Sequence, residues 1–217
     1  MADSDSRAGK RYDDAGTRTY VDRIHATHDA ALDKAFDAPG SADMPAIQVA
    51  QSEGKMLELL CRLANARKAV EVGTLAGYST IRLARGLMDG GHLWSLEISE
   101  KHAAVARENI SAAGLDDRVT VRVGDARQTL SALAGEGPFD LVFLDADKES
   151  YVDYGRWAAT HLRAGGVLIA DNAYYFGNLL EDDDDAARVR AFHEECARAF
   201  HSVCVPTPDG IVVGIKK

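Results

Sequence analysis

The stretch KAVEVGTLAGYSTIRLARGLMDGGHLWSLE, residues Lys68–Glu97, decides the fold. It begins with a short apolar run at Lys68–Val72, passes through a glycine-containing turn and continues into a helical pattern at Ser79–Leu87. A second apolar run follows at His92–Leu96. A strand, a helix and a strand of these lengths predict a βαβ unit, in which the two strands lie parallel in one sheet.

The same alternation continues along the chain. Right-handed crossovers between such strands would place helices on both faces of the sheet. The further apolar runs are Val119–Val123, Leu141–Leu144 and Val167–Ala170, and the helical patterns between them are Glu100–Ala113, Arg127–Leu133 and Tyr151–His161.

The C-terminal part has a different pattern. After a helix expected at about Asp185–Phe200, two apolar runs, His201–Val205 and Ile211–Ile215, are joined by the turn sequence PTPDG. Two strands joined by such a turn predict a hairpin, so one edge of the sheet should be antiparallel. The sequence therefore predicts an α/β fold with a doubly wound, mostly parallel, seven-stranded sheet and a C-terminal antiparallel hairpin.

The region before the sheet is expected to be helical after a polar start. Residues 1–15 are small and charged, which predicts a flexible tail. One helix is expected at Thr17–Phe36, a proline-containing loop at Asp37–Pro45, and then a helix capped by Ser52. We expect a single domain at residues 16–217, in which residues 16–47 form an N-terminal helix and lid.

Composition excludes several classes of protein. The 217 residues are 46% hydrophobic and 27% charged, as in an ordinary globular domain, and the formal net charge is −9. This acidic balance argues against a nucleic-acid partner. No apolar run is long enough to span a membrane, and the N-terminus lacks the apolar segment of a secretory signal. We therefore expect a cytoplasmic protein that has neither nucleic acid nor a membrane as a partner.

Cysteine and histidine do not form a recognisable metal motif. The three cysteines, Cys61, Cys196 and Cys204, show no CxxC spacing, so we expect reduced thiols. His25 and His28 would share one face of the predicted helix, with no third ligand nearby in the sequence. We expect these histidines to contact solvent or the lid.

The ends of the first three strands carry features that suit an adenosine-bearing ligand. Gly73 and Gly77 form a GxxxG turn, which differs from the GxGxxG of dinucleotide binders. Glu97 ends the second strand, where an acidic side chain can bind a ribose diol. Ala126, in the sequence Gly-Asp-Ala after the third strand, leaves room for an adenine ring. Together these features favour an adenosine ligand that lacks a pyrophosphate.

Polar side chains also follow the next two strands. Asp145 comes directly after the strand FDLVFL, and Asp171 and Asn172 come directly after GVLIA. If these strands are neighbours, the three side chains converge at one edge of the sheet, and oxygen ligands of this kind suit Mg²⁺. The alternative is that both aspartates only cap turns or helices.

Four segments of the chain form a recognisable set of motifs: QVAQSEGK (residues 48–55), VEVGTLAGYS (70–79), FDLVFLDADK (139–148) and GGVLIADN (165–172). Together they resemble the cation-dependent O-methyltransferases of the caffeoyl-coenzyme A and catechol type. The resemblance implies the Rossmann-like class I methyltransferase fold, S-adenosylmethionine as cofactor, Mg²⁺ or another divalent cation, and a homodimer.

The resemblance also implies roles for individual residues. Asp145, Asp171 and Asn172 match the metal ligands, and Asp145 is expected to act in catalysis and to contact the cofactor as well. Lys148 matches a proposed general base; the alternative is a solvated lysine or an ion pair with Asp147 or Glu149. The other positions that match cofactor contacts are Val49, Glu71, Gly73, Thr74, Ser79, Glu97, Ala126 and Asp147.

The residues after Asn172 bear on the substrate. Tyr174, Tyr175 and Phe176 would form an aromatic wall for a flat ring, or would be ordinary core aromatics. The N-terminal region is unlike the coenzyme A-binding segment of plant relatives, which favours a small catechol. A vicinal diphenol suits a metal-assisted reaction, because chelation by Mg²⁺ would lower the pKa of its hydroxyls and fix the attacking oxygen.

The sequence thus predicts an S-adenosylmethionine- and Mg²⁺-dependent enzyme that methylates one hydroxyl of a small phenolic substrate. One alternative is a nicotinamide-dependent oxidoreductase, against which the absent GxGxxG counts. Another is a binding protein with the methyltransferase fold and no catalysis. A metal-dependent hydrolase would leave Glu97 and Ala126 without a role.

Overall fold

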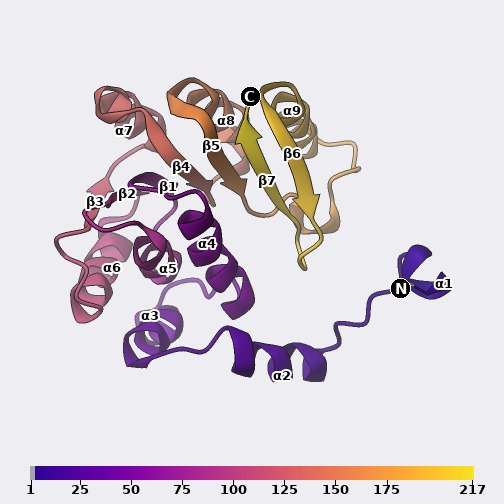
Figure 1. The fold of residues 1–217 in the computed structure, drawn as a ribbon, viewed down its shortest axis with the longest axis horizontal. Coiled ribbons are helices and arrows are strands. Elements are labelled where there is room, and N and C mark those ends of the chain that lie inside the picture. The colour runs from indigo at the N-terminus through magenta and orange to yellow at the C-terminus, as the bar shows by residue number, and fades with distance from the viewer. Residues whose placement is uncertain (1–2) are drawn as a thin grey trace.

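A computed structural model describes residues 3–217 and centres on one seven-stranded sheet (Figure 1). The strand order is β3-β2-β1-β4-β5-β7-β6, which confirms the predicted fold class. Strands β1 to β5 are parallel, and β7 pairs antiparallel with both β5 and β6. The strands are β1 (Lys68–Val72), β2 (His92–Glu97), β3 (Val119–Val123), β4 (Phe139–Leu144), β5 (Leu162–Ala170), β6 (Phe200–Val205) and β7 (Ile211–Lys216).

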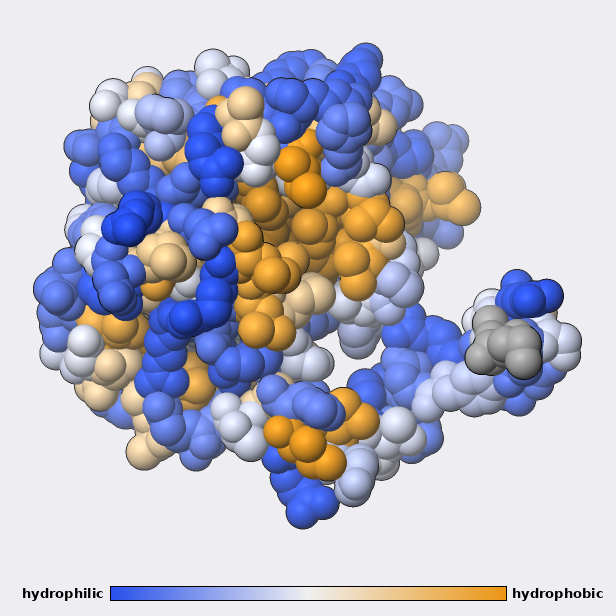
Figure 2. Space-filling view, viewed as in Figure 1, coloured by the Kyte–Doolittle hydropathy of each residue, from blue (hydrophilic) through white to orange (hydrophobic). Residues whose placement is uncertain are grey.

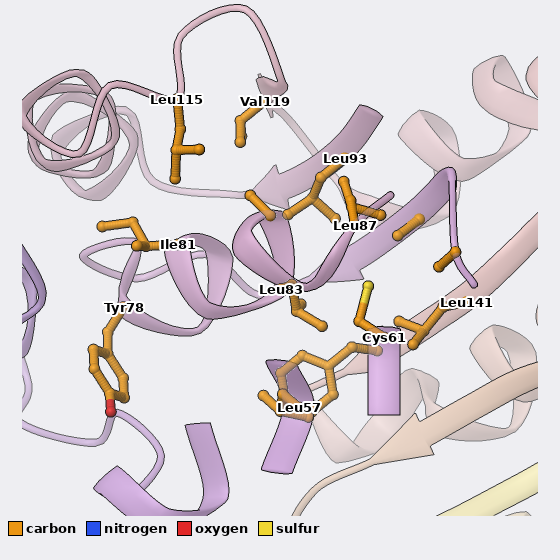
Figure 3. Packing of buried hydrophobic residues seen from close by; sticks show 14 of the residues in the cluster. Leu57, Cys61, Tyr78, Ile81, Leu83, Leu87, Leu93, Leu115, Val119 and Leu141 are labelled. Atoms are coloured by element: carbon orange, nitrogen blue, oxygen red, sulfur yellow. The ribbon is translucent and has the colours of Figure 1, made fainter. Parts of the chain in front are cut away.

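Three helices cover each face of the sheet, as right-handed crossovers require. The first face is covered by α4 (Gln51–Leu63), α5 (Tyr78–Gly86) and α6 (Glu100–Ala112). Figure 3 shows this core, in which Leu57 and Cys61 lie beside Leu83 and Leu141. The second face is covered by α7 (Ala126–Leu133), α8 (Tyr151–His161) and α9 (Asp184–Ala199).

The helices leave part of the first face open beside the C-terminal hairpin. Figure 2 shows hydrophobic side chains gathered there, over α4 and the β6–β7 hairpin. Leu59 and Leu63 of α4, and Val203 and Ile215 of the hairpin, are exposed hydrophobic residues. None of the helices within residues 3–217 is both long and apolar enough to cross a bilayer.

The predicted helix at Thr17–Phe36 is wrong, because the structure has two helices there. Helix α2 (Ala15–His25) ends at His25, and α3 (Ala30–Ser41) begins after Asp29. The Asp29 carboxylate accepts a hydrogen bond from the backbone nitrogen of Leu32 (3.0 Å), so it caps and starts a new helix. His25 and His28 therefore do not share a helix face.

Two further boundaries differ from the expectation. The predicted loop at residues 37–45 begins only at Ala42, because α3 continues through Pro39, which is buried together with Ala38 in its last turns. Ser52 is not a cap: α4 begins one residue earlier, and Glu53 accepts a bond from the Ala50 nitrogen (2.8 Å).

The predicted tail is also partly ordered into helix. A short helix, α1 (Ser4–Arg7), lies within it, and α2 begins at its last residue, Ala15. Met1 and Ala2 lie outside the described residues. In Figure 1, α1 lies apart from the body of the molecule.

The turn after β1 depends on glycine. Gly73 has φ +99°, and a Cβ atom there would lie 1.9 Å from the backbone oxygen of Asp145. Gly77 has φ +86° and precedes the first residue of α5. Gly73 therefore allows the ends of β1 and β4 to approach closely, and Gly77 allows the turn to pack against Ala106 of α6.

Candidate active site

A cavity of about 500 Å³ opens at the carboxyl ends of β1 to β4, the edge where open α/β sheets bind ligands. This volume suits a ligand the size of a nucleoside derivative. All of the predicted cofactor residues except Glu71 line it. They are Val49, Gly73, Thr74, Ser79, Glu97, Ala126, Asp145 and Asp147.

Glu71 lies beneath the cavity instead of lining it. Its carboxylate accepts hydrogen bonds from the hydroxyls of Ser79 (2.6 Å), Thr80 (2.5 Å) and Ser95 (2.6 Å). Burial raises the Glu71 pKa to about 7, and the three hydroxyl donors oppose this rise. Glu71 thus fixes the first turn of α5 against β2. A direct contact between Glu71 and the cofactor stays a prediction.

Glu97 joins β2 to the glycine turn. One carboxylate oxygen accepts from the backbone nitrogens of Thr74 (3.2 Å) and Leu75 (2.8 Å), and the other accepts from that of Ser99 (3.0 Å). His102 Nδ1 lies 3.5 Å from Glu97 Oε1, and His102 also lines the cavity. His102 was not predicted from the sequence, because it approaches Glu97 only when the end of β2 and the first turn of α6 are folded.

Asp147 is held from two sides at the cavity wall. Its carboxylate accepts from the Tyr154 hydroxyl (2.8 Å) and from the Ser150 backbone nitrogen (3.0 Å). Tyr154 lines the cavity too, and burial raises its pKa well above the ordinary value. Tyr154 was also missed. Its spacing of seven residues from Asp147, two helical turns, is the signal that could have indicated it.

The ends of β4 and β5 bring Asp145 and Asp171 together. Leu144 pairs with Ala170 in the sheet, so the next residue of each strand is one of these aspartates. Burial raises the pKa of Asp145, and burial together with the charge of Asp145 raises the pKa of Asp171 to about 7. Glu53 of α4 adds further negative charge near both. The structure therefore places two carboxyl groups that repel each other at the adjacent ends of β4 and β5.

The C-terminal hairpin supports the loop after β5, which carries Asn172. Asn172 has φ +54°, a conformation that asparagine tolerates better than most residues. The backbone nitrogens of Ala173, Tyr174 and Phe176 donate to Gly210 O (3.0 Å), Asp209 O (2.8 Å) and Asp209 Oδ1 (2.8 Å). Asp209 was not predicted from the sequence, because its contacts form only when the β6–β7 turn packs against the loop after β5.

Lys148 points at a tyrosine and not at Asp147 or Glu149. Its ammonium donates to the Tyr151 hydroxyl (2.6 Å) and to the Ala146 carbonyl (3.0 Å). Burial lowers the Lys148 pKa, and the negative charges around it, Asp145 first among them, oppose that shift. Lys148 therefore does not form the ion pair with Asp147 or Glu149 that was one alternative to its role as a base. The role as general base stays a prediction.

The predicted metal ligands supply two carboxylates and one amide. Within residues 3–217, no three His, Cys, Asp or Glu side chains gather closely enough to hold a metal ion. Asp145, Asp171 and Asn172 nevertheless offer only oxygen donors, as a hard cation requires, and the repulsion between the two carboxyls is what a bound cation would relieve. The residues fit the predicted ion, and the ion itself stays a prediction.

The three aromatic residues after β5 differ in their surroundings. Phe176 is 66% exposed, so it is not a core aromatic. Tyr174 is half-buried against the hairpin, where a Cβ atom on Gly210 would lie 2.9 Å from its ring. Tyr175 and Phe176 both have positive φ, which holds this turn in an uncommon conformation.

Comparisons with known proteins identify the relatives of this chain. A sequence model of the family described as O-methyltransferase matches residues 25–217. The catechol O-methyltransferase of Mycobacterium tuberculosis is 47% identical over 172 residues, covering 79% of this chain and 78% of that protein. The catechol O-methyltransferase of Niastella koreensis is 40% identical over 200 residues, covering 91% and 90%. The structure of an O-methyltransferase from Bacillus cereus in complex with SAH is similar, with a TM-score of 0.89, 37% identity and coverage of 93% and 97%.

Proposed function

The chain belongs to the O-methyltransferase family and is an O-methyltransferase, and from this premise we propose its cofactors and substrate. The proposal is transfer of a methyl group from S-adenosylmethionine to one hydroxyl of a catechol-type molecule, with the aid of Mg²⁺ or another divalent cation. The observation that carries it is the position of Asp145. This residue lines the cofactor cavity and is also coupled by charge to Asp171 and Lys148.

The cavity supports the choice of cofactor. Glu97 presents its carboxylate at the end of β2, where it can bind ribose hydroxyls, and Ala126 leaves space for the base. Gly73 brings the backbone close to the remaining part of the ligand. The related B. cereus enzyme was solved with SAH, the form of the cofactor that remains after methyl transfer.

Asp145, Asp171 and Asn172 would hold the cation. A divalent cation in this position supplies Lewis acidity, which favours the ionised form of a phenolic hydroxyl near neutral pH. Asp145 would place the acceptor oxygen next to the cofactor, because Asp145 lines the cofactor cavity and is also one of the proposed metal ligands. The Asp209 bonds to Tyr174 and Phe176 fix the loop that carries Asn172.

Lys148 is the group that would take the hydroxyl proton on its Nζ atom. Its lowered pKa makes the neutral amine more accessible than in an ordinary lysine. The Tyr151 hydroxyl, which donates to the carbonyl of Asp171 (3.1 Å), holds Nζ at the end of β5. The proton would therefore leave on the side of the two aspartates.

The substrate class is supported by the relatives and by the loop after β5. The M. tuberculosis and N. koreensis relatives are catechol O-methyltransferases. The exposed ring of Phe176 lies on the same loop after β5 as Asn172. Two adjacent hydroxyls can approach one cation together, whereas a single phenol offers one oxygen. We therefore expect vicinal diphenols to be preferred.

A methyl-transfer assay tests the proposal. Protein is incubated with labelled S-adenosylmethionine and either catechol or resorcinol, with Mg²⁺, with EDTA, and with EDTA followed by excess Mg²⁺. We expect label on catechol with Mg²⁺, loss of transfer with EDTA, recovery on adding Mg²⁺ back, and little label on resorcinol. Equal turnover in EDTA would exclude the cation, and binding of NADH in place of SAH would favour an oxidoreductase.

Two expectations from the sequence remain open beside this proposal. The homodimer and the cytoplasmic location stay predictions. The exposed apolar side chains over α4 and the hairpin support association with a second copy. The molar mass in solution, measured by light scattering after gel filtration, tests the dimer.

A further inference from the structure

The N-terminal lid forms part of the cofactor cavity. We define the lid as residues 30–49, which comprise α3 and the segment that follows it. Its last residues, Pro45, Ile47, Gln48 and Val49, line the cavity. Whatever fixes the lid on the body of the protein therefore also fixes this wall of the cofactor site.

Tyr78 is the point where the lid meets the body. It is 1% exposed, begins α5 and lines the cavity. Its ring centroid lies 5.0 Å from that of Phe36 on α3 and 5.3 Å from that of His28. Gly54 of α4 is equally close, since a Cβ atom there would lie 2.7 Å from the Tyr78 ring. Figure 3 shows the Tyr78 hydroxyl directed away from the other labelled core side chains.

A chain of hydrogen bonds runs through this hydroxyl. Arg82 Nε lies 3.3 Å from the Tyr78 oxygen, His28 Nε2 lies 2.9 Å from it, and His28 Nδ1 lies 3.1 Å from Asp33 Oδ1. A guanidinium can only donate and a carboxylate can only accept. In neutral His28, Nδ1 carries the ring proton and donates to Asp33, and Nε2 accepts from the Tyr78 hydroxyl, whose oxygen accepts from Arg82. Nε2 can accept this bond only while His28 is neutral.

Arg82 fixes the segment that leads into the lid. It is 2% exposed and pairs with Glu58 of α4 (3.2 Å). Its second terminal nitrogen donates to the carbonyls of Ala26 (3.3 Å) and Thr27 (3.4 Å), in the break between α2 and α3. The break that the sequence analysis missed is thus where the body of the protein binds the lid.

We propose that His28 is a positioning residue that holds the lid over the cofactor site through Tyr78, and that it does so only in its neutral form. This inference rests on the proposed cofactor. When His28 gains a proton, Nε2 can no longer accept from the Tyr78 hydroxyl, and the new ring charge lies near the guanidinium of Arg82, so the link between His28 and Tyr78 is weakened. The lid is then held less firmly on the body and the cofactor binds more weakly.

The charges around His28 set the direction of this response. Asp29 and Asp33 attract a proton to the ring, whereas Arg82, paired with Glu58, repels it. Asp22 and Arg23 of α2 line a second cavity with His28 and are of opposite sign. Burial, followed by the charge of Arg82, lowers the His28 pKa below its ordinary value.

The sign of the pH effect follows from this lowered pKa. The unfolded chain, or an open lid, takes up a proton on His28 at a higher pH than the closed protein does. The closed lid is therefore fully stabilised above the ordinary histidine pKa of about 6.5 and loses stability as the pH falls below it. At pH 7.5 His28 should be neutral in nearly all molecules, and its bond to Tyr78 should be formed.

Calorimetric binding of SAH between pH 5.5 and 7.5, with hydrogen exchange of residues 30–49, tests the proposal. In the wild type we expect the affinity to fall about threefold or more on acidification, as the lid exchanges faster. Tyr78→Phe keeps the ring but removes the hydroxyl. We expect it to weaken binding about three- to tenfold at pH 7.5, the loss of one buried hydrogen bond.

Further variants separate His28 from general acid effects. His28→Leu should resemble Tyr78→Phe at pH 7.5 and should abolish most of the pH dependence, and the double variant should be no weaker than either single one. His25→Gln, at an exposed histidine in the last turn of α2, is the matched control and should behave as the wild type.

Three results would overturn the proposal. They are unchanged SAH affinity and lid exchange in Tyr78→Phe, a full pH dependence in His28→Leu, or the same loss of pH dependence in His25→Gln. Failure of the wild type to bind SAH would instead contradict the proposed cofactor. If His28→Leu does not fold, Tyr78→Phe and the wild-type pH series still decide the matter.

Discussion

The two sides of the site differ in how their carboxylates are compensated. We call the part with Glu71 and Glu97 the cofactor side and the part with Asp145 and Asp171 the acceptor side. On the cofactor side, Glu71 accepts three hydroxyl bonds and Glu97 accepts three backbone bonds. On the acceptor side, Asp145 and Asp171 follow paired residues of β4 and β5, and the charge of Asp145 raises the pKa of Asp171. The chain thus supplies hydrogen-bond donors to the carboxylates of the cofactor side. On the acceptor side the charge of Lys148 only partly offsets the negative charges of Asp145, Asp171 and Glu53, and a cation would compensate the remainder.

This difference has a functional meaning. A site whose polar groups are satisfied in advance binds its ligand with little rearrangement. A buried pair of carboxyls costs stability unless a positive charge compensates it. We therefore expect changes on the acceptor side to reduce turnover while leaving cofactor binding and folding intact.

Asp171→Asn is expected to have the largest effect. Changes to groups around metal ligands already cost roughly 10–100-fold, so loss of a direct ligand should reduce turnover by roughly 100-fold or more. The variant removes the repulsion with Asp145, so its melting temperature without added metal should equal or exceed that of the wild type. SAH affinity should change by less than about twofold. Retained turnover would show that Asp171 holds no cation.

Lys148→Met should reduce turnover by about 100-fold near pH 7, the lower part of the range for general acid–base catalysis. Lys148→Arg is the control, because it keeps the positive charge beside Asp145 but does not release a proton. Steady-state rates over pH 6 to 9 check this. If Arg restores the rate, Lys148 acts by its charge and not as a base.

Gly73→Ala should damage the cofactor side. The residue has φ +99° and no room for a Cβ atom against the Asp145 carbonyl. We expect a loss of stability of about 2 kcal/mol from backbone strain, with SAH affinity reduced about tenfold. Gly135→Ala, at a position with nothing within 4 Å of the added atom, should leave both unchanged. Denaturant unfolding and calorimetry measure these effects.

The increase in melting temperature on adding Mg²⁺ should depend on pH. This effect should be smaller than those of the variants above. The Asp171 pKa is raised to about 7 from an ordinary value of 3.8, so this group favours folding at low pH and its contribution is lost as the pH rises through about 7. Added Mg²⁺ should therefore raise the melting temperature more at pH 8 than at pH 6, by about 2–4 °C. In Asp171→Asn the difference between the two pH values should largely disappear.

The sequence predicted the parts of the molecule that depend on short-range pattern. The βαβ unit at Lys68–Glu97, the need for Gly73, and the convergence of Asp145 and Asp171 all follow from where apolar runs end. The break between α2 and α3 was not predicted, because helical spacing continues across it and only the Asp29 cap and the Arg82 contacts interrupt it.

The remaining site residues could not be predicted because they act through packing. His102 approaches Glu97 from the first turn of α6, the helix that follows β2, and Asp209 reaches the loop after β5 from the turn between β6 and β7. Glu71 shows the same limit in another form. The family resemblance implied a direct cofactor contact, whereas its three hydrogen-bond donors come from α5 and β2 and hold it beneath the cavity.

The most direct test of the contrast between the two sides is calorimetric binding with and without a cation. SAH is titrated into the protein in EDTA and in Mg²⁺, and catechol is then titrated into each SAH complex. We predict that SAH affinity changes by less than about twofold, and that catechol binds only when Mg²⁺ is present. Equal catechol binding in EDTA, or SAH binding that requires Mg²⁺, would contradict this account.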